Sequence, residues 1–162
     1  MSVEEWGLVA SVVFSGTFSG LLAMLTTILH PMMRSMEGPD FARFLRSFLP
    51  IARRAPFNSV AVLGMVIAPT IALIALGDEA GGTHFILTVL TAIGLALTTI
   101  GVFVVSRWLS EPNYDVMLAW DPDAMPADWR AVRSRYFALN WVRAAATWVA
   151  FAMFLTALVD LL

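Results

Sequence analysis

A stripe of polar side chains enters the last long apolar segment of the sequence. Steps of four, three and four residues place its members on one face of a helix: Tyr136, Asn140, Arg143 and Thr147. An arginine inside an apolar membrane helix costs roughly 2.5–3.5 kcal/mol at mid-helix, so Arg143 is expected to have a partner or a purpose. Guanidinium and amide groups donate hydrogen bonds, so the stripe could bind an anionic ligand, or one that becomes anionic by enolising.

Other polar groups of the chain could satisfy Arg143 instead. The candidates are the amides of Asn113 and Asn140 and the carboxylates of Glu111 and Asp115. In that interpretation Asn140 and Arg143 only brace a loop against the preceding apolar segment, and the arginine side chain extends toward water. The sequence leaves both interpretations open.

His30 and Asn58 lie at the ends of two other apolar segments. Helical spacing brings His30 to the end of a mildly polar face that also carries Ser19, Ala23 and Thr26. A lone histidine at such a place is ordinarily a solvated helix end, and Asn58 is ordinarily a cap or a headgroup contact. A functional role is the alternative for each residue.

Composition indicates what must position these side chains. Hydrophobic residues make up 59% of the 162 residues, charged residues only 14%, and the mean hydropathy is +0.79. These values are typical of an integral membrane protein and not of a soluble domain. The sequence contains no cysteine, which excludes disulfides, thiolate metal sites and dithiol redox relays.

Four apolar segments are long enough to cross a bilayer core of roughly 30 Å as helices. They cover residues 6–29, 57–77, 84–106 and 140–159. The chain is therefore predicted to be one all-α domain, residues 1–162, folded as a polytopic membrane four-helix bundle. Gly16 and Gly20 form a GxxxG pattern, which we interpret as close packing within the bundle, with a homo-oligomer interface as the alternative.

Residues 39–54 have a different pattern, that of an amphipathic helix. Phe41, Phe44 and Phe48 lie on one side, and Arg43 and Arg46 lie opposite. We therefore expect this helix to lie at the membrane interface with its phenylalanines inserted or packed on the bundle, in contact with membrane lipid. A lid over a lipid-facing entrance is the alternative.

The arginines predict the orientation of the chain. All ten basic residues are arginines, and all lie in residues 31–56 or between Arg107 and Arg143. Acidic residues such as Glu4, Glu5 and Asp160 collect near the other membrane face. By the positive-inside rule, residues 31–56 and the loop 107–139 face the cytoplasm, and both ends of the chain lie outside the cell membrane.

This orientation excludes several kinds of function. His30 and His84 fall at opposite membrane faces, so they cannot share a metal ion or a haem iron, and no metal or other cofactor is predicted. A proton-driven exporter would be expected to carry a carboxylate in the middle of a span, and every Asp and Glu lies near an end or in a loop. The arginines are explained by lipid, so no nucleic-acid partner is predicted.

The last third of the chain resembles the anthrone oxygenase-like family of four-span membrane proteins. The resemblance rests on a Pro-Asn pair after the third apolar segment, two loop tryptophans, an N-x-x-R pattern and an Ala-Phe pair: Pro112, Asn113, Trp120, Trp129, Asn140, Arg143, Ala150 and Phe151. One departure lies before the second segment, where the family often has an asparagine ahead of Pro-Phe. Here Asn58 follows Pro56 and Phe57.

The resemblance implies a cofactor-free oxygenation in which an anthrone-like aromatic ketone becomes a quinone. Asn113, Asn140 and Arg143 would donate to the developing oxyanion, and His30 would be the base, with an ordinary pKa of about 6.5. Asp115 is the alternative base. The remaining ligand contacts would come from Asn58, Asp115, Tyr136 and Thr147. The competing prediction is a non-catalytic membrane module that binds a quinone-like or lipid ligand, or that stabilises a partner enzyme.

Overall fold

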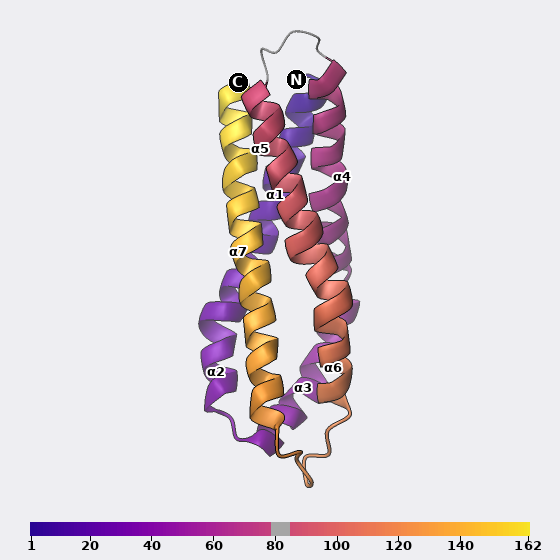
Figure 1. Ribbon diagram of the computed structural model, residues 1–162, viewed down its shortest axis with the longest axis vertical. Coiled ribbons are helices and arrows are strands. Elements are labelled where there is room, and N and C mark those ends of the chain that lie inside the picture. The colour runs from indigo at the N-terminus through magenta and orange to yellow at the C-terminus, as the bar shows by residue number, and fades with distance from the viewer. Residues whose placement is uncertain (79–84) are drawn as a thin grey trace.

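The computed structural model describes residues 1–78 and 85–162, so the predicted position of His84 lies outside the described residues (Figure 1). The first long helix is continuous through α1 (Val3–Met24), the π-helical stretch η1 (Leu25–Leu29) and α2 (His30–Ser35). It is followed by α3 (Gly38–Arg54) and α4 (Pro56–Asp78). The third long helix joins α5 (Phe85–Ala96), the π-helical stretch η2 (Leu97–Ser110) and α6 (Glu111–Leu118), and α7 (Trp129–Leu161) completes the fold.

Four of these helical rods are long and apolar enough to cross a membrane, which confirms the all-α polytopic bundle. The rod Val3–Ser35 has 33 residues, and at 1.5 Å per residue it is about 50 Å long. A bilayer core is roughly 30 Å thick, so this rod and the rods Phe85–Leu118 and Trp129–Leu161 extend well beyond it, whereas Pro56–Gly77, with 22 residues, roughly matches it. Figure 1 shows both chain ends at one end of the bundle, with α2, α3 and α6 gathered at the other.

Helix boundaries differ from the prediction mainly at this second end. The second span was predicted well. Residues 107–139 were predicted as the loop between the third and fourth spans, with the helix that carries Tyr136 beginning inside it, and the structure leaves only 119–128 of them outside the long helices. The helices continue because α3 packs against the ends of the rods and buries their aromatic side chains. Hydropathy predicts where a helix leaves the membrane. It does not predict where the helix itself ends, because helical hydrogen bonding can continue in water.

The amphipathic helix α3 lies almost where it was predicted. Its buried face carries Phe41, Leu45 and Leu49, and all three belong to a core cluster shared with α2, α6 and α7. Phe44 and Phe48 stack on each other with ring centroids 5.4 Å apart and pack against the same cluster. The expectation that these phenylalanines pack on the bundle is confirmed.

Small residues and hydroxyl groups bring the rods together at mid-bundle. A Cβ at Gly16 would lie 2.9 Å from the Phe151 ring of α7, so this glycine permits a close helix contact inside the molecule. Gly20 is exposed, and a Cβ there would meet no neighbouring helix of the described structure within 4 Å. Thr98 donates to the Met65 carbonyl of α4 at 3.0 Å, and the Trp148 indole donates to the Ser19 carbonyl of α1 at 3.2 Å.

Candidate functional site

A π-helical turn directly precedes His30. The His30 backbone N–H donates to the carbonyl of Leu25, five residues back, so the turn holds one residue more than an α-helical turn. The extra residue rotates the following side chains around the helix axis. His30 is only 1% exposed and faces α7, so the expectation of a solvated helix end is wrong.

Aromatic rings enclose the His30 imidazole. The ring centroid of Phe137 lies 4.5 Å from it and that of Tyr136 lies 5.7 Å away. Tyr114 of α6 packs edge-on against Tyr136 at 5.9 Å. Three helices therefore contribute to one buried aromatic cluster around the imidazole.

A chain of hydrogen bonds links His30 to Arg143. The Asn140 amide nitrogen lies 3.3 Å from His30 Nε2, and the Asn140 amide oxygen accepts from Arg143 Nη1 at 3.1 Å. An amide nitrogen can only donate, so Nε2 is the acceptor and a neutral His30 carries its proton on Nδ1. His30 Nδ1 is buried and has no hydrogen-bond partner among the residues that the structure describes.

Arg143 is half-buried, and none of its contacts among the described residues is to a carboxylate. Its Nη1 lies 3.4 Å from the Tyr114 hydroxyl, and its guanidinium lies 5.8 Å from the centroid of the Phe18 ring. Within residues 1–78 and 85–162, its buried Nε atom has no hydrogen-bond partner. The guanidinium therefore has donor capacity to spare.

A cavity of about 880 Å³ lies against this guanidinium. This volume lies within the range of small-molecule sites in proteins. Its polar lining residues include Asn58, Ser106, Tyr114, Tyr136, Asn140 and Arg143. Leucine, phenylalanine and other apolar side chains of α1, α3, α4 and η2 form most of the remaining wall.

The cavity reaches the outer surface of the bundle. The lining residues Met24, Leu63 and Phe103 are 45%, 55% and 42% exposed, and all three belong to helices that can span the membrane. Apolar side chains exposed at this level of a membrane protein contact lipid. The opening of the cavity therefore lies between helices that can span a membrane.

Charged residues form one border of the cavity. Arg53 of α3 pairs with Glu111 and lies 3.0 Å from Asp115, so these two carboxylates of α6 hold α3 beside the opening. Burial alone would lower the pKa of Arg53, but the charges of Glu111 and Asp115 outweigh it and hold the pKa above its ordinary value.

The structure brings together some of the predicted site residues. Asn58, Tyr136, Asn140 and Arg143 line the cavity. His30 is connected to it through Asn140 but does not line it. Thr147 is buried one turn further along α7, where its hydroxyl donates to the Arg143 carbonyl at 2.7 Å.

Two predicted residues lie elsewhere. The Asn113 amide is buried and lies 3.9 Å from the sulfur of Met117, and Asn113 is not among the lining residues. Asp115 is exposed and holds Arg53, so it is not placed as a base. Sequence reasoning missed Tyr114 and Ser106. Tyr114 directly follows Asn113, and its position next to that motif was the available signal.

Comparison with known proteins finds no matching family model, no matching curated protein and no matching solved structure.

Proposed function

We propose that the protein oxygenates an enolisable aromatic ketone of the anthrone type to a quinone in this cavity, without a cofactor. The observation that carries the proposal is Arg143, which lines an apolar cavity with unused donor capacity and no carboxylate partner among the described residues. The carboxylate that lines the same cavity, Glu111, is already paired with Arg53. A guanidinium in this position is suited to a ligand oxygen that acquires negative charge.

In the proposed reaction, the apolar and the polar lining of the cavity have different roles. The apolar wall holds the rings, and Arg143, Asn140 and Tyr114 surround the ketone oxygen. Loss of the acidic C–H proton makes that oxygen an enolate, and each donor to such an oxyanion contributes about 3 kcal/mol where this has been measured in enzymes. The carbanion carbon then reacts with O₂. In the balanced reaction one CH₂ group and one O₂ give one carbonyl group and one water.

His30 is the base in this proposal, and its position sets a condition. The imidazole lies behind Asn140, so a proton from the substrate reaches it only when the Asn140 side chain turns aside or a water molecule bridges the two. The enclosing rings of Tyr136 and Phe137 keep bulk water from the imidazole.

The same observation favours a second candidate, a non-catalytic module that binds a quinone-like or lipid ligand. Such a module needs donors to a ligand oxygen but no base within hydrogen-bond reach of the ligand. Asn140 and Arg143 supply donors, whereas His30 does not line the cavity. The two candidates share one cavity and differ in whether a proton leaves the ligand.

Oxygen uptake by the purified protein with a panel of anthrones distinguishes them, with quinone formation followed by absorbance and the rate without protein subtracted. Arg143→Lys keeps the charge but loses the planar donor fork, so turnover should fall about a hundredfold. Thr156→Ala, on the exposed face of the same helix, should not change it. If no anthrone turns over and a quinone still binds in an Arg143-dependent way, the binding module replaces the oxygenase.

The proposed orientation in the cell membrane completes this function. In this proposal, which follows the positive-inside rule, α2, α3 and α6 lie at the cytoplasmic face and both chain ends lie outside. The cavity then lies at the cytoplasmic end of the bundle, within reach of membrane-dissolved substrate.

A further inference from the structure

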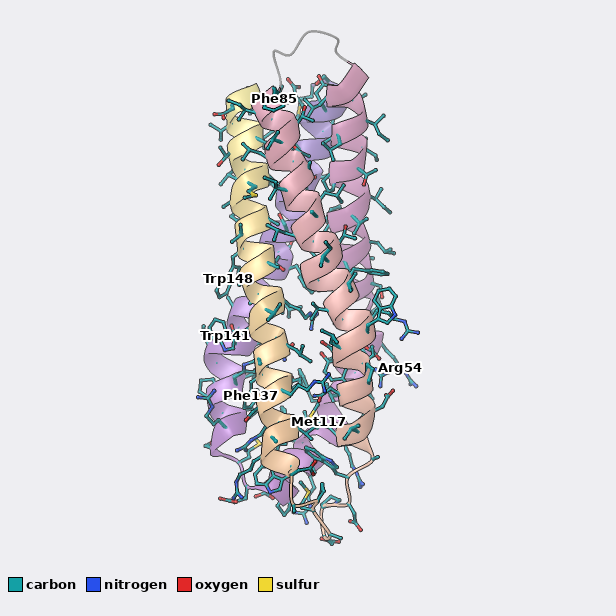
Figure 2. The ribbon with its side chains drawn as sticks, in the orientation of Figure 1. Arg54, Phe85, Met117, Phe137, Trp141 and Trp148 are labelled. Atoms are coloured by element: carbon teal, nitrogen blue, oxygen red, sulfur yellow. The ribbon has the colours of Figure 1, made fainter. Side chains whose placement is uncertain are left out.

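A second concave surface lies on the side of the bundle formed by α2 and α7. It is a groove of about 430 Å³, and its lining residues include three arginines, a serine hydroxyl and a tryptophan: Arg34, Arg130, Arg133, Ser134 and Trp141. Figure 2 labels Phe137 and Trp141 along this edge of α7. No residue of the groove lines the larger cavity.

Aromatic rings and backbone carbonyls hold the three guanidinium groups in place. Arg133 lies 4.5 Å from the Trp129 ring centroid, and its Nη1 donates to the Met36 carbonyl at 2.9 Å. Arg130 lies 4.7 Å from the same ring, on α7, and Arg34 lies 5.6 Å from the Phe137 ring. These contacts fix the arginines before any ligand arrives, which lowers the entropy cost of binding.

The positive charge of the groove is not neutralised within the described part of the chain. Arg43 and Arg53 both lie within ion-pair distance of carboxylates, whereas the three arginines of the groove have no such pair there. The charge of Glu37 acts on Arg133, but Glu37 does not line the groove. Three like charges in one groove repel one another, so an anion bound among them is favoured.

The position of the groove relative to the membrane indicates which kind of anion binds there. Trp141 is 42% exposed where the apolar part of α7 begins, the place where tryptophans mark the membrane interface. Ser134 and Arg133 lie seven and eight residues before it, about 10 Å along the helix axis and outside the hydrocarbon core. Lipid phosphates lie at that level. Ile28 and Met32, exposed on the neighbouring helix, offer an apolar surface for acyl chains.

We infer that this groove binds the phosphate of an anionic membrane phospholipid, with Arg34 and Arg130 as its principal ligands. Arginine matches phosphate because its planar fork donates two parallel hydrogen bonds. A free phosphate ion offers the same oxygens but lacks acyl chains to contact Ile28, Met32 and Trp141. This site is independent of the proposed oxygenation.

Native mass spectrometry of the detergent-solubilised protein tests the inference with three probes. They are short-chain phosphatidylglycerol, short-chain phosphatidylcholine and inorganic phosphate. The variant Arg34→Gln/Arg130→Gln removes two exposed arginines of the groove and spares Arg133, which binds the end of α2. The matched control, Arg54→Gln/Arg135→Gln, removes two exposed arginines outside the groove. Helical circular dichroism and the two single variants show whether a lost signal reflects folding.

Phosphatidylglycerol should bind wild type and control at least about tenfold more tightly than phosphatidylcholine. Both lipids carry the phosphate, but the quaternary ammonium of phosphatidylcholine would lie among like-charged guanidinium groups. The groove variant should lose this preference while keeping its fold. Equal loss in the control would overturn the site, because it would mean a diffuse attraction to arginines. Inorganic phosphate that binds as tightly as phosphatidylglycerol would overturn the lipid assignment.

Discussion

Asn140 has the most demanding position of any residue in the site. Its amide serves two partners at once, the buried His30 ring through nitrogen and the half-buried Arg143 guanidinium through oxygen. Leucine has nearly the same size and can serve neither. A buried polar group that loses its partner costs about 1–3 kcal/mol, and more for a charged group.

Asn140→Leu should therefore destabilise the protein by at least about 2 kcal/mol, because both partners lose a bond in an apolar environment. The melting temperature in detergent, followed by circular dichroism, measures the effect. Thr156→Val is the control, since its hydroxyl bonds only to the backbone of its own helix at an exposed position. An unchanged melting temperature for Asn140→Leu would show that the network is not formed in solution.

Phe41 offers a second test at the scale of one residue. It is fully buried, and its ring lies near those of Trp120 and Phe137. Phe41→Ala should cost about 3–5 kcal/mol because it leaves a cavity in a packed cluster. Phe85→Ala, at a position 71% exposed, should cost little. Thermal unfolding of both variants compares the two environments, and equal losses would contradict a packed α3.

At the scale of elements, α3 joins the core cluster at this end of the bundle to the opening of the cavity. Its apolar face packs in the core cluster, and Arg53 ties its end to α6 beside the opening. Exposed ion pairs contribute at most about 1 kcal/mol, so this tie fixes the position of the helix end more than it stabilises the fold.

Arg53→Gln should accordingly leave the melting temperature within a few degrees of wild type and increase amide exchange near the end of α3. Arg54→Gln removes the same charge one residue later, where the side chain points away from the bundle (Figure 2), and should leave exchange unchanged. Hydrogen exchange with mass spectrometry resolves the two. Equal exchange in both variants would show that the ion pairs do not hold α3.

Much of the element scale was predictable from the sequence. The four spans and α3 follow from hydropathy and helical periodicity, which need no tertiary information. The helical spacing of Tyr136 and Asn140 predicted that the last helix begins before its apolar segment. The continuation of the third helix through residues 107–118 was not predictable in this way, since polar side chains there are compatible with either a helix or a loop. Packing of Tyr114, Met117 and Trp129 against α3 determines the outcome.

The site was predictable in part for the same reason. Tyr136, Asn140 and Arg143 lie on one helix, so their common face follows from spacing alone. His30 joins them through the π-helical turn at Leu25–Leu29, and an extra residue in a helical turn leaves no pattern in an apolar sequence. Asn113 was expected to donate into the site, and helical spacing did not reveal that its amide turns toward Met117.

For the molecule as a whole, the proposed location of the site at the cytoplasmic face depends on the orientation of the chain in the membrane. Ala127 is exposed in the short connection before α7, and the natural sequence has no cysteine to interfere. In intact cells, Ala127→Cys should resist a membrane-impermeant maleimide and react after permeabilisation. Ser2→Cys, near the opposite end of the bundle, should react without permeabilisation. The reverse pattern would invert the proposed topology.

The exposed apolar lining at Met24, Leu63 and Phe103 affects how the apparent dissociation constant of a ligand of this cavity is interpreted. A ligand that enters sideways is drawn from the lipid phase, and its effective dilution is set by its partition coefficient. A compound that favours lipid a thousandfold gains about 4 kcal/mol of apparent binding without any contact to the protein. Weak recognition by Arg143 and Asn140 would then suffice for occupancy in cells. Dissociation constants for this protein are comparable only when expressed as mole fractions of lipid.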